Sequence, residues 1–223
     1  MDANPPYLAI LNPNASDTVT EAIARAAAPF ARLGVEIESI TSPDGPFGIE
    51  SDEDVAASVE PMLGLARDRE EAALGFVVAC YSDPGLTALR AQSARPVVGI
   101  QEASVSLALA SGRSFGVAAI LPASVKRQRR NFLAAGLEQR WAGSRPLGLG
   151  VAELADPDRT MARLVEVGRA LRDEDGADVV ILGCAGMSDY RRDLSRALDL
   201  PVIDPTQAAV SIALGRILPD AAP

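Results

Sequence analysis

An apolar run that ends in a cysteine occurs twice in this chain, at residues 75–80 and 178–184. A second apolar run opens at Pro96, 16 residues after the first cysteine, and its counterpart opens at Pro201, 17 residues after the second. In both halves a segment of the form Val-Ser-apolar-Ala-Leu begins nine residues after that proline. Two copies of one pattern predict two similar halves that pack about a pseudo-twofold axis.

Strand-like and helix-like segments alternate along the chain, as they do in folds where helices flank parallel sheets. Thr18 and Glu21 have the spacing of a capping box, and Asp156 followed by Pro157 marks a helix start with a first-turn proline. We therefore expect an α/β fold of two pseudo-symmetric lobes, each a mainly parallel sheet flanked by helices, with a cleft between them. The predicted strands cover 7–11, 35–40, 75–80, 115–121 and 178–184, the predicted helices cover 18–30, 55–69, 125–137 and 157–171, and a loop covers 41–54.

The repeat divides the chain near its middle. We expect residues 1–100 to form the first lobe and residues 101–204 the second. The terminal helix at 205–223 is expected to pack back on the first lobe. A chain of 223 residues is long enough for two lobes of roughly 100 residues each.

Cys80 and Cys184 each follow a predicted strand and precede a small, glycine-containing turn. Open α/β sheets bind ligands outside the carboxyl ends of their strands, which is where both thiols fall. A helix N-terminus after such a turn stabilises a thiolate, so we expect thiol pKa values below the usual range. Packing about a twofold axis would bring the two thiols to one cleft from opposite sides, as a two-base reaction at one carbon requires.

Three other interpretations of the two cysteines are open. Free cysteine is often simply a small buried apolar residue. A disulfide would need an oxidising compartment, whereas the chain shows no signal peptide and is expected to be cytoplasmic. A zinc site would need more ligands, and the chain contains no histidine. The repeat favours a functional pair, and the lack of histidine leaves these thiols as the best candidates for acid–base work near neutral pH.

Composition narrows the classes of partner. The chain is 48% hydrophobic with a net charge of −9, which indicates a globular protein and argues against a nucleic-acid partner. No apolar stretch has the length of a membrane span, so no membrane partner is expected. A small molecule is the expected partner, and the sequence leaves open whether the chain forms a homo-oligomer.

Two charged runs have local explanations. The basic run 126–130 is expected to be the solvated side of a helix that buries Val125, Phe132 and Leu133. The acidic residues of 50–54 are expected to form a solvated loop or a helix cap rather than a metal site, because nothing else in the sequence implies the phosphate substrate that usually accompanies magnesium.

Five motifs occur in order over nearly the whole chain: LNPNAS at 11–16, GPFGIES at 45–51, ACYSDPGL at 79–86, PVVGI at 96–100 and LGCAGM at 182–187. Together they resemble the motifs of the Asp/Glu/hydantoin racemase superfamily, most of all those of its hydantoin and allantoin racemase branch. The resemblance implies two pseudo-symmetric α/β lobes that each contribute one catalytic cysteine.

By that resemblance the chain is a racemase or epimerase that works without cofactor or metal, with Cys80 and Cys184 as catalytic residues. It would remove a proton from the carbon next to a carbonyl of a hydantoin-like or amino-acid-derived substrate. Asn12 has a structural alternative in shaping the turn before Pro13, as Ser82 has in capping the next helix. The residues that match substrate-binding positions are Asn12, Tyr81, Ser82, Ala185 and Gly186.

Departures from the family pattern leave the substrate open. Tyr81-Ser82 and Ala185-Gly186 differ from the residues of the amino-acid racemases, which makes free aspartate or glutamate less favoured. Ala118-Ala119 stand where the hydantoin branch often has two threonines, and residues 52–54 stand where it often has an aromatic side chain. The alternatives are an aspartate or glutamate racemase, a maleate-type cis–trans isomerase with a nucleophilic cysteine, and a non-enzymatic small-molecule binding module.

Overall fold

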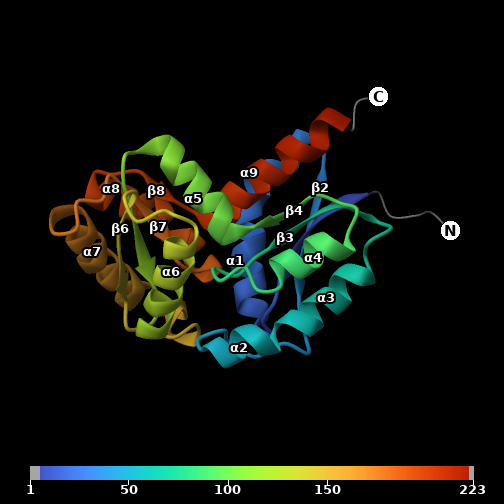
Figure 1. Ribbon diagram of the computed structural model, residues 1–223, viewed down its shortest axis with the longest axis horizontal. Coiled ribbons are helices and arrows are strands. Elements are labelled where there is room, and N and C mark those ends of the chain that lie inside the picture. Colours follow the sequence, from blue (N-terminus) through green and yellow to red (C-terminus); the bar gives the residue numbers. More distant parts are fainter. Residues whose placement is uncertain (1–5, 221–223) are drawn as a thin grey trace.

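Two four-stranded parallel sheets build the two lobes of the protein, seen in a computed structural model that describes residues 6–220 (Figure 1). The strand orders are β2-β1-β3-β4 and β6-β5-β7-β8, so the same order recurs in both lobes. The predicted fold class is confirmed. The strands are β1 (Tyr7–Asn12), β2 (Glu36–Thr41), β3 (Ala73–Val78), β4 (Val97–Gly99), β5 (Phe115–Ala119), β6 (Trp141–Pro146), β7 (Val179–Leu182) and β8 (Val202–Ile203).

Helices cover both faces of each sheet, which explains why the inner strands β1, β5 and β7 are buried along their whole length. The first lobe carries α1 (Asp17–Ala27), the 3-10 helix η1 (Ala28–Leu33), α2 (Asp52–Ala57), α3 (Val59–Arg67), α4 (Leu86–Gln92) and α5 (Ile100–Ser111). The second carries α6 (Pro122–Ala134), η2 (Ala152–Ala155), α7 (Pro157–Asp173), η3 (Ala185–Tyr190), α8 (Arg191–Leu198), α9 (Pro205–Ile217) and η4 (Leu218–Asp220).

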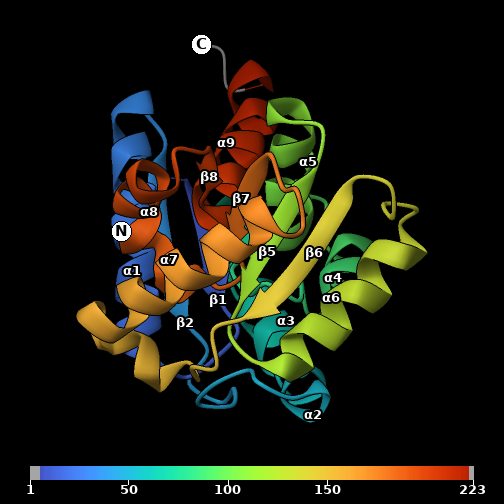
Figure 2. The ribbon, with the colours of Figure 1, turned by 90° about the vertical axis from the view of Figure 1, so that its left-hand side faces the viewer.

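The last helix of each lobe packs against the other lobe. Helix α5 leaves β4 and lies against β7, while α9 leaves β8 and lies against β3 and β4. The two helices also pack against each other, and they stand side by side in Figure 2. Residues 1–5 of the expected first lobe and residues 221–223 of the expected terminal helix lie outside the described part of the chain.

Several predicted boundaries were wrong for local reasons. Helix α1 begins at Asp17 because Ser16 is its cap, with Oγ accepting from the Val19 N–H, so Thr18 and Glu21 form no capping box. Helix α2 begins at Asp52, inside the predicted loop, and extends into the region predicted to be helical from residue 55. Helix α6 begins at Pro122, where proline fits the first helical position. The predicted cap and first-turn proline of α7 are confirmed.

No sequence pattern predicted β6. Its residues, Trp141–Pro146, lack an apolar run, and all six are half-buried because β6 is an edge strand of the second sheet. Edge strands need no continuous apolar sequence, which removes the signal that located the inner strands. Within residues 6–220, no helix combines the length and apolar character needed to cross a bilayer.

Helices α7 and α8 pack closely enough to give a stability test. A Cβ added at Gly168 would lie 2.5 Å from the Leu198 Cδ1 atom, whereas one added at Gly215 in α9 would meet nothing within 4 Å. Gly168→Ala should therefore destabilise the fold by about 1–3 kcal/mol through overpacking, and Gly215→Ala should be neutral or stabilising by up to about 1 kcal/mol. Thermal denaturation should show a Tm lowered by roughly 2–10 °C for Gly168→Ala only. Equal melting of the two variants would contradict this packing.

Candidate active site

Cys80 and Cys184 occupy equivalent positions, each two residues beyond the third strand of its sheet. Both sulfurs face one cavity between the lobes, at the carboxyl ends of the strands. Both cysteines are free thiols, so the disulfide alternative does not hold in this structure. The cavity has a volume of about 30 Å³ and is lined by Asn14, Val19, Ile49, Ala79, Cys80, Tyr81, Ser82, Ile120, Ser124, Arg127, Gln128, Val151, Gly183, Cys184 and Ala185.

The walls of this cavity differ in polarity. The side formed by the start of α1 presents Val19, whereas the side formed by α6 presents Ser124, Arg127 and Gln128. Both lobes contribute to the lining, because Ile49 comes from the first lobe and Val151 from the second, and the Val151 N–H donates to Glu50 Oε1 at 2.7 Å. A bound molecule would therefore meet one apolar and one polar wall.

Burial raises the pKa of both thiols. At Cys80 the hydrogen bond with Ser82, whose Oγ lies 3.2 Å from Sγ, and the positive charge of Arg127 act in the opposite direction. At Cys184 burial raises the pKa to about 12, against a hydrogen bond from the Gly186 N–H. The prediction that helix N-termini lower the pKa of both thiols is therefore wrong. Near Cys80, α4 begins only at Leu86, beyond the first-turn reach of a helix dipole. At Cys184, burial outweighs the hydrogen bond from the Gly186 N–H.

The two thiols also act on each other. A negative charge at Cys80 raises the pKa of Cys184, so the ionised form of one favours the neutral form of the other. This coupling is the electrostatic sign that the two sulfurs share one site. It also favours a state with one thiolate and one thiol over a state with two thiolates.

Comparison with known proteins assigns this arrangement to a family. A family model described as Asp/Glu/Hydantoin racemase matches residues 8–213. The hydantoin racemase of Paenarthrobacter aurescens is 34% identical over 207 residues, which cover 92% of this chain and 88% of that protein. The chain belongs to the Asp/Glu/hydantoin racemase family.

Two solved structures extend the match to three dimensions. Allantoin racemase from Klebsiella pneumoniae has a TM-score of 0.89 and 32% identity, and the match covers 97% of this chain and 89% of that chain. Allantoin racemase from Pseudomonas fluorescens has a TM-score of 0.86 and 31% identity, with coverage of 94% and 91%. The resemblance inferred from the motifs is confirmed, and the protein is an isomerase of the racemase class.

Most of the residues that the sequence motifs predicted to bind substrate lie at the cavity. Tyr81, Ser82 and Ala185 line it. Gly186 lines an adjoining groove instead, while its N–H reaches the sulfur of Cys184. All four belong to the two turns that follow the cysteine-bearing strands.

Asn12 does not line the cavity. Its side chain is fully buried, and Nδ2 donates to Asn14 Oδ1 and to Thr20 Oγ1, each at 3.0 Å, while Oδ1 accepts from the Asn14 N–H at 3.2 Å. The amide is therefore used in shaping the turn into α1, which leaves it without a free group for a ligand. Asn14 takes the place at the cavity that the sequence analysis assigned to Asn12.

The polar wall that α6 presents to the cavity was not predicted from the sequence. Arg127 and Gln128 were expected on a solvated face, but Arg127 is 7% exposed and Gln128 is 2% exposed, and both face the cavity. Of the apolar residues expected to be buried on this helix, Phe132 is buried and Leu133 is exposed. Ser124, Gln128 and Phe132 are spaced four residues apart, so Ser124 and Gln128 lie on the same face of the helix as the buried Phe132. This spacing is the sequence signal for polar groups on the buried face.

The acidic segment before and within α2 holds the lobes together. Ser51 caps the helix and Asp54 completes a capping box, which confirms the helix-cap interpretation. Asp52 accepts from Arg127 Nη1 at 2.8 Å and from Arg130 Nη2 at 3.1 Å. Asp52 belongs to the segment 52–54, where the hydantoin branch often has an aromatic side chain, and it holds the Arg127 side chain at the cavity.

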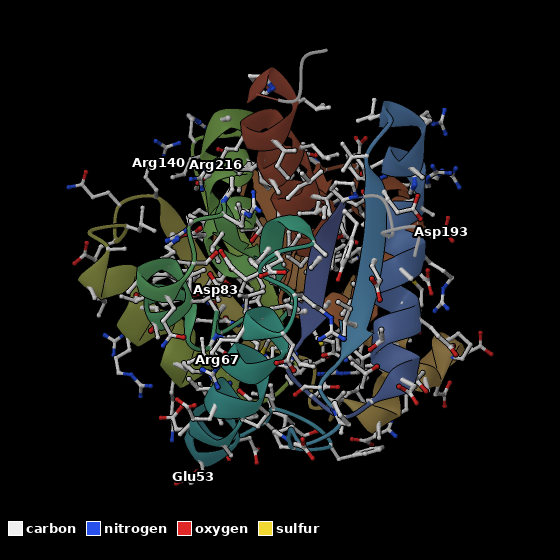
Figure 3. All side chains as sticks on the ribbon, turned by 90° about the vertical axis from the view of Figure 1, so that its right-hand side faces the viewer. Glu53, Arg67, Asp83, Arg140, Asp193 and Arg216 are labelled. Atoms are coloured by element: carbon white, nitrogen blue, oxygen red, sulfur yellow. The ribbon has the colours of Figure 1, made fainter. Side chains whose placement is uncertain are left out.

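An aspartate ties the first cysteine turn to helix α5. Asp83 accepts hydrogen bonds from two backbone N–H groups in the first turn of α5, each at 3.0 Å, and burial raises its pKa to about 7 against their effect. Asp83 is half-buried and falls near the middle of the view in Figure 3, whereas Glu53 falls at the lower edge. Gly99 is the N-cap residue of α5, and a Cβ there would lie 2.3 Å from Asp83 Cγ, so only glycine leaves room for this cap.

The raised thiol pKa values give a test of the site. In the folded racemase both cysteines should be alkylated slowly by iodoacetamide near neutral pH and faster as the pH rises, because only the thiolate attacks. Mass spectrometry of the two cysteine-containing peptides measures each rate. The same protein unfolded in urea supplies the control, with thiols that titrate in the ordinary range. A cysteine whose rate follows the same pH profile folded and unfolded would contradict the effect of burial.

Proposed function

We propose that this enzyme racemises or epimerises a hydantoin-like or amino-acid-derived small molecule, with Cys80 and Cys184 as its acid–base pair and without a cofactor. The observation that carries the proposal is that two free thiols from equivalent positions in two lobes face one cavity. The names of the hydantoin and allantoin racemases that it matches support a cyclic ureide as substrate.

The proposed reaction needs one thiolate and one thiol. The thiolate removes the proton from the carbon next to the carbonyl, and the electron pair of that C–H bond moves toward the carbonyl oxygen to form an enolate. The opposite thiol then donates its proton to the other face of the carbon, which leaves a thiolate there. The roles of Cys80 and Cys184 exchange for the other enantiomer, so the fold's pseudo-symmetry matches the symmetry of the reaction.

Local hydrogen bonds support both roles. Ser82 lowers the pKa of Cys80, and the Gly186 N–H lowers that of Cys184, although burial is the larger effect at both. Each sulfur therefore has a neighbour that stabilises its charged form when it acts as the base. A reaction that needs both thiols reduced suits a reducing compartment, and we propose the cytoplasm.

The two single cysteine variants test the assignment. Cys80→Ser and Cys184→Ser should each lose racemisation, because a serine hydroxyl is too weak an acid to replace a thiol or thiolate. Each variant should keep solvent deuterium exchange at the reacting carbon for the one enantiomer whose proton the remaining cysteine removes. Exchange followed by NMR on the separate enantiomers of a chiral hydantoin should show opposite preferences for the two variants.

Three outcomes would overturn parts of the proposal. Full turnover by either variant would remove the two-base assignment. Wild-type enzyme that exchanges no hydantoin, allantoin or amino-acid proton above background would remove the substrate class. A covalent adduct between one cysteine and the substrate, trapped and identified by mass spectrometry, would indicate nucleophilic rather than acid–base chemistry.

A further inference from the structure

Gln128 carries a buried polar atom that the protein leaves unsatisfied. The residue is 2% exposed and lines the cavity, and among residues 6–220 its Oε1 has no hydrogen-bond partner. A buried acceptor without a donor costs about 1–3 kcal/mol, so such an atom at a cavity indicates a ligand that supplies the donor. The ligand must therefore bring an N–H or O–H group to α6.

Arg127, the preceding residue, offers the opposite kind of group. Its Nη1 is engaged by Asp52 at 2.8 Å, and the side chain lines the same cavity. A guanidinium has five N–H donors in one plane, so the contact with Asp52 leaves others for a ligand. The α6 wall thus presents donors from one residue and an acceptor from the next.

The position of this wall relative to the cysteines is fixed by hydrogen bonds. One turn further along α6, Asn131 donates to Gln101 Oε1 at 3.0 Å, and Gln101 Nε2 donates to the Tyr81 carbonyl oxygen at 2.8 Å. This chain of two bonds connects α6 to the turn that carries Cys80. The donors and the acceptor are therefore held in place before a ligand binds.

We propose that Arg127 and Gln128 together bind the N–H and C=O edge of a cyclic ureide or imide, with Gln128 Oε1 accepting from a ring N–H and Arg127 donating to the neighbouring carbonyl oxygen. This inference rests on the proposed function and names the residues that select its substrate. The ring N–H is a donor for Gln128 Oε1, and the neighbouring ring carbonyl is an acceptor for the Arg127 N–H groups. The two pairs of groups are adjacent both on the ring and on α6.

The unsatisfied acceptor separates a ureide from a free carboxylate. A carboxylate offers only acceptors, so Arg127 would bind it while Gln128 Oε1, with the amide oriented as in this structure, stayed buried without a donor. A ring N–H satisfies that atom and removes the penalty. The α6 wall therefore favours the neutral ring, which uses both Arg127 and Gln128. An open-chain acid of similar size would use Arg127 alone.

Binding of an unreactive ring tests the inference apart from catalysis. The probe is a hydantoin with two methyl groups on the reacting carbon, which has no proton to exchange and so reports binding alone. Two further probes carry an additional methyl on one or the other ring nitrogen, which removes one N–H at a time. Isothermal titration calorimetry gives the Kd of each probe for wild type, Gln128→Met, Arg127→Met and, as a matched exposed position on the same helix, Arg129→Met.

Methylation of one ring nitrogen should weaken binding to wild type roughly 5- to 150-fold, the range expected when a buried acceptor loses its donor. Gln128→Met should weaken binding of the parent probe. It should also abolish the difference in Kd between the parent probe and the probe methylated on that nitrogen. Arg127→Met should weaken all three probes, because each keeps its carbonyl groups, and Arg129→Met should bind like wild type. Gln128→Met should also melt no lower than wild type, because it removes an unsatisfied polar atom from the interior.

Each failure points to one conclusion. Wild type that does not bind the parent probe, or Gln128→Met that retains both its affinity and its sensitivity to methylation, would overturn the inference. Gln128→Met that melts well below wild type would assign Gln128 to the fold, and the Arg127→Met affinities then decide whether α6 binds the ring. Probe binding as expected, without exchange of chiral hydantoins, would leave this inference standing and remove the proposed reaction.

Discussion

The packing of α5 against α9 is the interaction on which the rest of the molecule depends. Each helix comes from the last strand of one lobe and lies against the cysteine-bearing strand of the other, so β3 and β7 are each held by a helix from across the molecule. Small buried residues of the two helices, such as Ala108 and Ala213, allow the close approach. One apolar cluster therefore runs through both lobes, and sliding of one lobe against the other would expose apolar surface in both.

The capping of these two helices shows how a symmetric fold acquires an asymmetric site. In the second lobe Asp204 stands at the start of α9 and caps it directly, with Oδ1 accepting from the Gln207 N–H at 2.8 Å. In the first lobe the equivalent residue is Gly99, and the capping carboxylate comes from Asp83 in the cysteine turn. The Cys80 turn is thereby fastened directly to α5 by its own aspartate. The Cys184 turn continues into the 3-10 helix η3, whose Ser188 hydrogen-bonds Asp204 at the start of α9.

Sequence patterns correctly predicted the strands that are buried along most of their length. The apolar runs before Cys80 and Cys184 predicted inner strands, and their repetition predicted the arrangement of the lobes. Features that depend on contacts between distant segments had no such signal. The burial of Arg127 depends on Asp52 of the other lobe, and the burial of Asn12 depends on a turn whose hydrogen bonds satisfy its amide. A run of charges on a helix is ordinarily solvated, and here the tertiary fold overrides that tendency.

Burial of the thiols sets the balance between thiol and thiolate that the proposed two-base reaction requires. Removing a thiolate from water raises its pKa, which makes the thiolate scarcer but also a stronger base toward a weakly acidic C–H bond. Ser82 and Arg127 reduce that cost at Cys80, and the Gly186 N–H reduces it at Cys184. Because a charge on Cys80 raises the pKa of Cys184, the second ionisation is costlier than the first. The shared cavity therefore favours one thiolate and one thiol from two identical side chains. In the proposed reaction, the substrate's enantiomer would decide which sulfur acts as base and which as acid.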